Sequence, residues 1–234
     1  MYHQIGNYPR PNGHKRSFCH IKRFRQQMAF LKWAGFHVIS LEQAHRALFC
    51  AGSLKPRSVV LTFDDGYQDF YEQAWPVLRK HGYPATVFLV SGLIGKPARW
   101  QTDFDTIAQL MDVPTILELR DQGVHFGAHS VNHSRLSELS IPAMRKEIFD
   151  SKTALENLLG QEVLDFCYPY GIYDERVRDF VEEAGYRTGL TCIRGAANAS
   201  DNAFELKRKS ISYGTGVFSF AKRVYGKHNL KGRS

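Results

Sequence analysis

The sequence has few cysteines and no long apolar run, and each shortage excludes a class of protein. Only four of its 234 residues are cysteine, and none forms a Cys-x-x-Cys pair, so neither a disulfide framework nor a thiolate zinc site is expected. No apolar stretch is long enough to cross a bilayer. The opening residues lack the basic region and apolar core of a secretory signal. If Met1 is the true start, we expect a cytoplasmic protein, at most peripheral at the inner face of the membrane.

Acidic residues are absent from both ends of the chain. All 23 of them lie between Glu42 and Glu205, whereas residues 1–41 carry seven Lys or Arg and residues 206–234 carry eight. Two interpretations stand: ordinary solvated charge, or a surface that meets an anionic partner such as a phosphate-bearing carrier, an acidic glycan or a membrane. Nucleic acid is not expected as a partner, because no recognition module is found by pattern.

Apolar runs alternate with helical patterns along the chain, as is typical of βα units around a parallel sheet. Buried-strand patterns fall at 36–40, 58–63, 84–90, 124–127, 163–168, 187–191 and 206–212. Helical patterns fall at 21–34, 41–49, 69–81, 114–122, 141–159, 174–184 and 217–224. About seven such units predict one α/β domain over residues 1–234, a distorted (β/α) barrel with a basic tail from about residue 225.

Two of the predicted strands end in residues that suit a metal ion. Asp64 and Asp65 directly follow the strand at 58–63; one carboxylate can bind a cation while the other acts as a base, although an Asp-Asp-Gly turn that caps a helix is the structural alternative. His129 and His133 follow the strand at 124–127, and their spacing of four residues puts both imidazoles on one face of a helical turn. Because active groups collect at the carboxyl ends of parallel strands, these residues are expected to converge.

A third strand ends in Pro169 and Tyr170. The turn either simply terminates the strand or aims a backbone N–H and an aromatic wall at a substrate carbonyl. Trp100 lies in a Gly- and Pro-punctuated segment of the kind that often lines a site. It is a candidate for stacking on a sugar, with a place in the core as the alternative.

In this order and at these separations, the three segments resemble the polysaccharide deacetylases of carbohydrate esterase family 4, which share the NodB homology domain. The resemblance covers nearly the whole chain. Two further segments are similar to the branch that includes the biofilm poly-N-acetylglucosamine deacetylases: Tyr2-His3-Gln4-Ile5 and Phe24-Arg25-Gln26-Gln27-Met28.

The resemblance implies roles for these residues. Asp65, His129 and His133 would bind one divalent metal ion, most often zinc, and Asp64 would be the general base. The metal ion would polarise the acetyl carbonyl, and the backbone N–H of Tyr170 would help to hold the oxyanion. The implied reaction is hydrolysis of the N-acetyl group of an amino sugar, in a polysaccharide or in a lipid- or nucleotide-linked saccharide, with release of acetate.

The sequence departs from the family pattern at two places. Cys167 stands where most members have an Arg that orients the base, so another group must tune Asp64. No late Leu-x-His is present to supply the general acid. In the biofilm branch the N-terminal Tyr-His takes this role, which makes His3 the predicted acid, with His125 as the alternative.

Rival functions remain at this point. The same scaffold could remove a formyl group or hydrolyse another amide. The two departures would suit an inactive sugar-binding protein, although Asp64, Asp65, His129 and His133 are all present. A membrane-surface scaffold would use only the basic ends.

Overall fold

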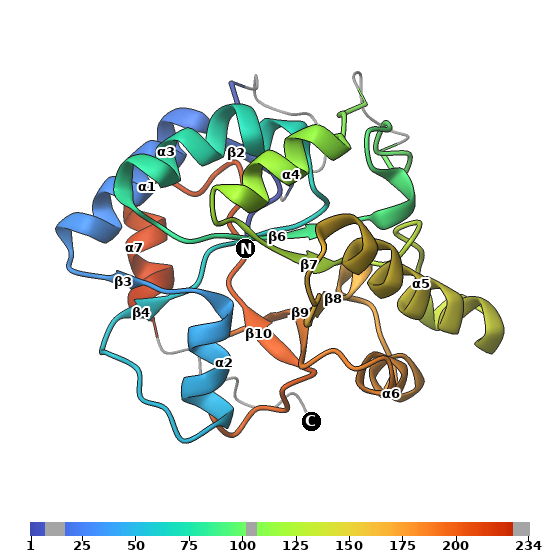
Figure 1. The fold of residues 1–234 in the computed structure, drawn as a ribbon. Helices are drawn as coiled ribbons and strands as arrows, with labels where there is room; N and C mark the ends of the chain where they lie inside the picture. Colours follow the sequence, from blue (N-terminus) through green and yellow to red (C-terminus); the bar gives the residue numbers. More distant parts are fainter. Residues whose placement is uncertain (8–16, 102–106, 227–234) are drawn as a thin grey trace.

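A curled sheet of six parallel strands forms the centre of the molecule (Figure 1). The computed structural model describes residues 1–7, 17–101 and 107–226. The strands lie side by side in the order β10 (Leu206–Arg208), β9 (Thr188–Arg194), β8 (Asp165–Cys167), β7 (His125–Ala128), β6 (Thr86–Leu89) and β5 (Thr62–Phe63). All four residues of β6 are buried, as expected of a parallel strand that is covered on both faces.

Helices surround the sheet (Figure 1). They are α1 (Ile21–Trp33), α2 (Leu41–Phe49), α3 (Trp75–His81), α4 (Val113–Asp121), α5 (Ile141–Leu159), α6 (Glu175–Glu183) and α7 (Val217–Tyr225). Their ends follow local chemistry. Ser40 and Gln43 form a capping box at the start of α2, and Gly160 takes the left-handed conformation that ends α5. Short turns of other helical types are η2 (Phe70–Ala74), η3 (Ser91–Leu93), η4 (Leu136–Glu138) and η5 (Pro169–Gly171).

The first residues of the chain close the open side of the curled sheet. Tyr2 bridges to Phe63 of β5: its N–H donates to the Thr62 carbonyl at 2.8 Å, and its carbonyl accepts from the Asp64 N–H at 2.9 Å. On the other side, the Ile211 N–H beyond β10 donates to the Met1 carbonyl at 3.0 Å. This segment then continues into β1 (Gln4–Gly6), which pairs with β2 (Phe18–His20). His3 is therefore held next to the end of β5.

The predicted fold class is confirmed, with local differences. The predicted strand at 58–63 is divided into β4 (Ser58–Val59) and β5, and the strand at 36–40 is shortened to β3 (His37–Val38), which pairs with β4. The short strands β1 and β2 were not predicted, because their stability comes from long-range pairing and not from a local pattern. The predicted helix at 69–81 begins with the π-helical turn η2.

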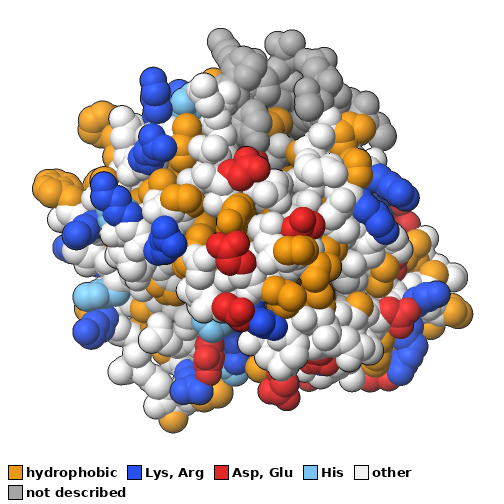
Figure 2. Space-filling view, turned by 45° about the horizontal axis from the view of Figure 1, so that its top comes forward, with side chains coloured by type: hydrophobic (Ala, Val, Ile, Leu, Met, Phe, Trp, Pro, Cys, Tyr) orange, Lys and Arg blue, Asp and Glu red, His pale blue; other side chains and the backbone are white. Residues whose placement is uncertain are grey.

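Charge is distributed unevenly over the surface. Figure 2 shows Lys and Arg side chains with few Asp or Glu along the left flank, the side of α1 in Figure 1, whereas side chains of both charges are intermixed on the right of that view. Helices α1 and α7 contain no acidic residue. In the described part of the chain, no helix has the length and apolar character needed to span a membrane.

Candidate metal-dependent active site

Four polar side chains from two strand ends converge in the interior. Asp64 and Asp65 follow β5, and His129 and His133 follow β7; all four are buried. Burial of two carboxylates and two imidazoles is costly unless each is paired or binds a cation. The structure thus brings together all four residues that the sequence singled out at these strand ends.

Asp65, His129 and His133 present their donor atoms to one point. The Oδ1 atom of Asp65 lies 3.2 Å from Nε2 of His129 and 3.3 Å from Nε2 of His133. Donors that share a tetrahedral zinc ion at bond lengths near 2.1 Å stand about 3.4 Å apart. The two nitrogens and one oxygen also suit zinc and related divalent ions, and three protein ligands leave a position open for water. This donor set fits the divalent metal ion that the resemblance implies.

The orientation of His129 is fixed by a second contact. Its Nδ1 lies 2.6 Å from the carbonyl oxygen of Cys167. Because a carbonyl oxygen can only accept a hydrogen bond, Nδ1 must carry a proton and donate it in this contact. Nε2 is then the nitrogen with a free lone pair, and it is the nitrogen that faces Asp65. Hydrogen bonding of the remote nitrogen to a carbonyl is the usual way in which a metal-binding histidine is held in the correct tautomer.

The turn that carries the two histidines is conformationally strained and is held by a buried carboxylate. Ser130 and His133 both have positive φ, at 62° and 58°, which costs free energy for residues with a side chain. From α5, Glu147 accepts hydrogen bonds from the N–H groups of Val131 and Asn132 at 3.0 and 2.9 Å and from the Asn132 side chain at 2.6 Å. Glu147 therefore holds the turn in the shape that presents both imidazoles.

Asp64 is paired with an arginine that the sequence did not reveal as functional. Arg208 of β10 donates to both carboxylate oxygens, from Nη1 at 2.7 Å and from Nη2 at 2.8 Å. Its remaining N–H groups reach Thr62, the Thr191 carbonyl and the Cys167 sulfur. Burial alone would raise the pKa of Asp64, but the charge and hydrogen bonds of Arg208 hold that pKa below its usual value. Asp64 is thus ionised at neutral pH, which is the form in which a carboxylate can accept a proton.

The metal-binding residues also depart from ordinary titration. Burial opposes the ionised form of Asp65, yet hydrogen bonds from His129 and His133 hold the pKa of this carboxyl well below its usual range. Burial lowers the pKa of His133. Burial also opposes the charged form of His129, but its contacts with Cys167 and Asp65 hold the pKa of this imidazole well above its usual value, so His129 must release a proton when a metal ion binds. An ionised carboxylate and a neutral imidazole are the forms that bind a metal ion.

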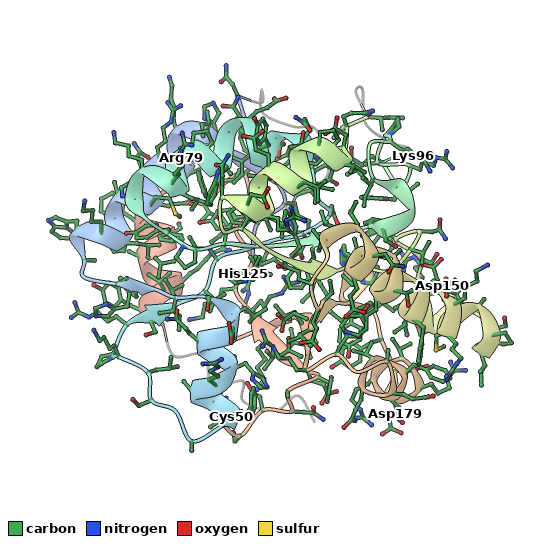
Figure 3. All side chains as sticks on the ribbon, in the orientation of Figure 1. Cys50, Arg79, Lys96, His125, Asp150 and Asp179 are labelled. Carbon is green, nitrogen blue, oxygen red and sulfur yellow. The ribbon has the colours of Figure 1, made fainter. Side chains whose placement is uncertain are left out.

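His3 lies on the other side of Asp64. Its Nε2 is 3.9 Å from Oδ2 of Asp64, and its imidazole is one of the groups that lower the pKa of both Asp64 and Asp65. The alternative acid, His125, occupies the first position of β7 and is exposed (Figure 3). It stands four residues before His129 on an extended strand, about 13 Å away along the strand axis. His125 is therefore at the wrong end of β7 to reach the site.

Aromatic rings line the approach to the two histidines. The Trp100 ring stacks on His133 with centroids 4.1 Å apart, and the Tyr170 ring meets His133 edge-on at 4.5 Å. Tyr170 has φ of 60° within η5, directly after the buried Pro169, and the Arg135 guanidinium lies over its ring at 4.8 Å. Trp100 is thus at the site, although its role in binding sugar stays a prediction, as does the oxyanion role of the Tyr170 N–H.

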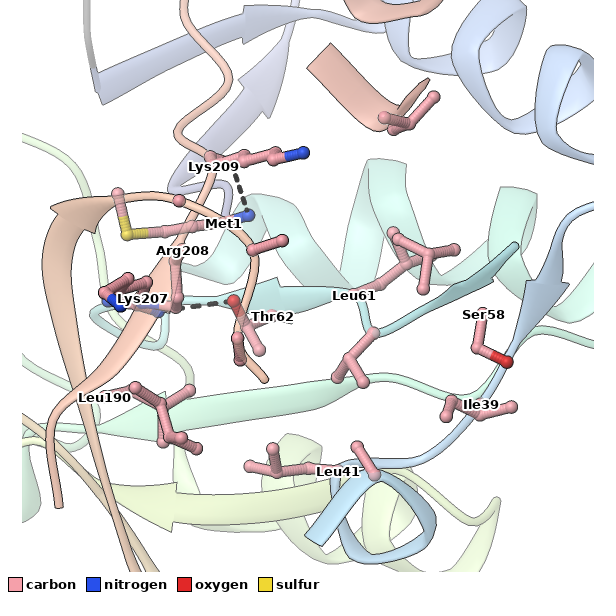
Figure 4. A pocket seen from close by; sticks show the side chains of 18 of the residues that line it. Met1, Ile39, Leu41, Ser58, Leu61, Thr62, Leu190, Lys207, Arg208 and Lys209 are labelled. Atoms are coloured by element: carbon pink, nitrogen blue, oxygen red, sulfur yellow. Dashed lines mark hydrogen bonds between the residues drawn. The ribbon is translucent and has the colours of Figure 1, made fainter. Parts of the chain in front are cut away.

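A cavity enclosed by described residues lies apart from this cluster (Figure 4). It has a volume of about 250 Å³ and a mostly aliphatic lining that includes Leu61, Leu190 and Leu206. Arg208 and Thr62 lie at its border and hydrogen-bond each other at 3.2 Å. None of the four residues that converge at the strand ends is among its lining residues. This cavity is therefore separate from the space that these four side chains enclose.

Two residues of the site, Arg208 and Glu147, were missed by sequence reasoning. In the sequence, Arg208 is one of several cations of the basic C-terminal end, and nothing in its neighbourhood marks it as a partner of a residue 144 positions away. Glu147 has a weak signal, because it occupies a buried position of α5 among apolar neighbours. A charged residue on the buried face of a helix indicates a specific partner.

The geometry agrees with the comparisons with known proteins. The family model described as polysaccharide deacetylase matches residues 51–189 of the sequence. The chain belongs to the polysaccharide deacetylase family. It is therefore an enzyme of the family that its motifs resemble, and the candidate metal site is formed by the residues that the motifs indicate.

Two relatives show how far the likeness extends in sequence. The chain is 29% identical over 199 residues to YxkH of Bacillus subtilis (strain 168), which covers 85% of this chain and 67% of that protein. It is 26% identical over 165 residues to the poly-beta-1,6-N-acetyl-D-glucosamine N-deacetylase of Staphylococcus aureus (strain N315), which covers 69% of this chain but only 57% of that enzyme. The chain thus spans little more than half the length of the staphylococcal relative.

Solved structures share the fold over almost the whole chain. The Streptococcus pyogenes deacetylase PplD, solved in complex with acetate, has a TM-score of 0.82 and 28% identity, and the match covers 96% of each chain. IcaB from Ammonifex degensii has a TM-score of 0.73 at 20% identity, covering 96% of this chain and 98% of that one, and this match shows likeness of fold alone.

Proposed function

We propose that this deacetylase hydrolyses the N-acetyl group of an amino sugar within a saccharide, releasing acetate and a free amine. The single observation that carries the proposal is the arrangement around Asp64. This ionised carboxylate stands next to a cation-binding set on one side, and a histidine lies 3.9 Å away on the other. Amide hydrolysis requires a base for the attacking water and an acid for the leaving amine, and the two lie within one cluster.

The residues divide the work as follows. Asp65, His129 and His133 would hold the divalent ion, which we propose to be zinc. That ion would act as a Lewis acid toward the amide carbonyl and would lower the pKa of bound water. Asp64, held in its ionised form by Arg208, takes the proton from the attacking water. His3 donates a proton to the nitrogen of the leaving sugar amine. The Tyr170 N–H stabilises the developing oxyanion.

An amino sugar as substrate is supported by two features. Trp100 and Tyr170 form an aromatic wall on both sides of His133, and aromatic rings commonly bind the apolar faces of sugars. Among the relatives, the staphylococcal enzyme is named for poly-beta-1,6-N-acetyl-D-glucosamine, and the PplD structure contains acetate, the product of N-deacetylation. We propose Pro169, Tyr170 and Trp100 as substrate-binding residues.

The basic ends suggest that the saccharide is attached to an anionic carrier at the inner face of a membrane. This part of the proposal rests on the positive charge of the two ends, and several of the cations near the C-terminal end already have partners within the protein. Arg208 is paired with Asp64, Lys207 with Asp201, and Lys209 donates to backbone carbonyls. The basic tail beyond residue 226 lies outside the described residues.

Acetate release from N-acetylglucosamine oligosaccharides, measured with Zn²⁺ added and with a chelator, tests the proposal. We expect acetate release that depends on the metal ion and disappears in Asp64→Asn. The same reaction mixtures should be analysed for formate with N-formylated substrates, because faster release of formate would favour a deformylase. Binding of the oligosaccharide without any hydrolysis in the metal-loaded protein would favour an inactive sugar-binding protein and would contradict the proposal.

A further inference from the structure

Helices α1 and α7 lie side by side on one flank of the molecule (Figure 1) and expose a group of aromatic side chains. Trp33 is 84% exposed, Phe218 is 89% exposed and Tyr225 is 51% exposed. Half-buried Phe30 links two of them, since its ring centroid lies 6.1 Å from that of Trp33 and 6.3 Å from that of Tyr225. Phe218 precedes Tyr225 by seven residues, so both project from the same side of α7.

Cationic side chains surround these rings. The Arg57 guanidinium lies over the Tyr225 ring at 5.7 Å, Lys32 is next to Trp33 in sequence, and Lys222 is one helical turn after Phe218. Lys22 falls on the same stripe of α1 as Trp33, eleven residues earlier. We call this surface the α1–α7 face; its members are Phe30, Trp33, Phe218, Tyr225, Lys22, Lys32, Arg57 and Lys222.

The α1–α7 face has no acidic residues to neutralise it. Neither helix contains Asp or Glu, and none of its four cations forms an ion pair with another residue in the described ranges. Figure 2 shows the concentration of Lys and Arg, with apolar side chains between them, on the α1 flank. This face is therefore aromatic and net positive at once.

Isolated exposed apolar residues are common and need no partner. The α1–α7 face differs because Phe30, Trp33 and Tyr225 form a group of rings among cations that have no ion-pair partner in the described ranges. Trp, Tyr and Phe together with Lys and Arg is the composition of protein surfaces that rest at the headgroup level of a bilayer, where amphipathic rings enter the interface and cations meet anionic lipids. A second copy of the chain does not fit, because pairing of two identical faces would bring like charges together.

We propose that the α1–α7 face binds the surface of an anionic lipid bilayer, with Trp33 and Phe218 entering the interface and the surrounding Lys and Arg contacting lipid headgroups. The proposal goes beyond the deacetylase activity and does not depend on it, because the face shares no residue with the metal site.

Co-sedimentation of the full chain with lipid vesicles tests this directly. One set of vesicles contains phosphatidylcholine alone, and the other replaces about one third of it with phosphatidylglycerol. We expect binding only to the anionic set, with a loss of at least about tenfold in affinity when salt is raised until surface charges are screened. Equal binding to both sets, or binding to neither at low salt, would overturn the proposal.

Matched variants separate this face from general charge. We expect Trp33→Ala/Phe218→Ala and Lys32→Glu/Lys222→Glu each to weaken binding about tenfold or more. The first control is Ile141→Ala, which removes an exposed apolar side chain of α5. The second is Lys96→Glu/Lys146→Glu, which changes the net charge by the same amount at exposed positions outside the α1–α7 face. Figure 3 labels Lys96 on the opposite side of the molecule from Arg79, which marks the flank of α1 and α3. If the controls weaken binding as much as the paired variants, the α1–α7 face is not the binding surface.

Sedimentation velocity in the absence of lipid tests whether a second copy of the chain covers the α1–α7 face instead. We expect a monomer at all concentrations used for vesicle binding. A dimer that disappears in Trp33→Ala/Phe218→Ala would show that a second copy covers the face and would contradict the membrane proposal. All of these positions are at the surface, so circular dichroism should show an unchanged fold in each variant.

Discussion

The two halves of the proposed active site, its metal-binding half and its acid–base half, are built in different ways. The metal-binding half comes from short stretches of chain: Asp65 follows β5, and His129 and His133 share one turn after β7. The acid–base half comes from the ends of the chain, because Asp64 is held between His3 near the start and Arg208 near the end. One half depends on local turns, and the other depends on closure of the whole curled sheet.

This difference shows which part of the site is autonomous. The His129–His133 turn needs mainly its own hydrogen bonds and Glu147 from α5 to keep its shape. The position of His3 needs the pairing of Tyr2 with β5, and the position of Arg208 needs β10. We therefore expect changes in the acid–base half to alter catalysis while metal affinity is retained, and changes that support the turn to alter metal affinity first.

The largest effect is expected for Asp64→Asn. An amide cannot accept the proton of the attacking water, so kcat should fall by about 10³-fold or more. Because Asp65, His129 and His133 are unchanged, the dissociation constant for Zn²⁺ should change by less than about threefold. Kinetics of acetate release and a metal titration on the same preparation measure both quantities. Equal losses of metal affinity and activity would mean that Asp64 is a ligand and not the base.

His3→Gln is expected to lower kcat on N-acetyl amides by about 10²-fold, because the leaving amine then lacks its proton donor. An aryl acetate ester has a leaving group that departs without protonation, so hydrolysis of such an ester should be nearly unaffected. His125→Gln, at the opposite end of β7, is the matched control and should leave both rates unchanged. Equal losses on amide and ester would remove His3 from the role of acid.

Arg208→Lys should have a smaller effect that is visible in the pH profile. Lysine keeps the positive charge but lacks the planar fork that binds both oxygens of Asp64. Burial raises the pKa of Asp64 and the hydrogen bonds of Arg208 lower it, so loss of one of these hydrogen bonds should raise that pKa. A base with a higher pKa becomes protonated earlier as the pH falls. The acid limb of kcat/KM should thus move to higher pH, with a loss of about tenfold at neutral pH. An unchanged acid limb would mean that Arg208 does not tune the base.

Glu147→Gln should have the smallest effect on turnover. The amide keeps its size, but its oxygen is a weaker acceptor for the N–H groups of Val131 and Asn132. Its NH2 group replaces the oxygen that accepts from the Asn132 side chain, which loosens the turn. We expect Zn²⁺ affinity to fall about tenfold, with kcat nearly restored at saturating metal. Glu138→Gln, at an exposed position outside this network, is the control. A variant with full metal affinity would show that Ser130 and His133 hold the turn without Glu147.

The parts of the site that the sequence revealed are those encoded by neighbours in the chain. Asp64, Asp65, His129 and His133 stand at the ends of strands whose apolar patterns are clear, so their convergence follows from parallel-sheet geometry. Arg208 could not be found in this way. Cys167 indicates only that the usual arginine is missing. The guanidinium of Arg208 comes from β10 and reaches Asp64 because the curled sheet is closed by Tyr2, which bridges to Phe63 of β5. Such contacts leave no periodic signal.

The fold was predictable to the same degree and for the same reason. Helix ends carry caps such as Ser40 and Gly160, and buried strands carry runs of β-branched and aromatic residues. The division of the predicted strand at 58–63 and the pairing of β1 with β2 depend on tertiary hydrogen bonds between distant segments. Propensity does not report such bonds.

The central claim is that Asp65, His129 and His133 close around one divalent ion that the acid–base pair requires. Its most direct test is to strip the protein of metal and measure acetate release from an N-acetylglucosamine oligosaccharide as Zn²⁺ is returned in small steps. We expect activity to rise in proportion to added Zn²⁺ and to stop rising at one equivalent, and no activity to return in His129→Ala. Full activity in the stripped protein, or an equal response to Zn²⁺ in His129→Ala, would contradict the claim.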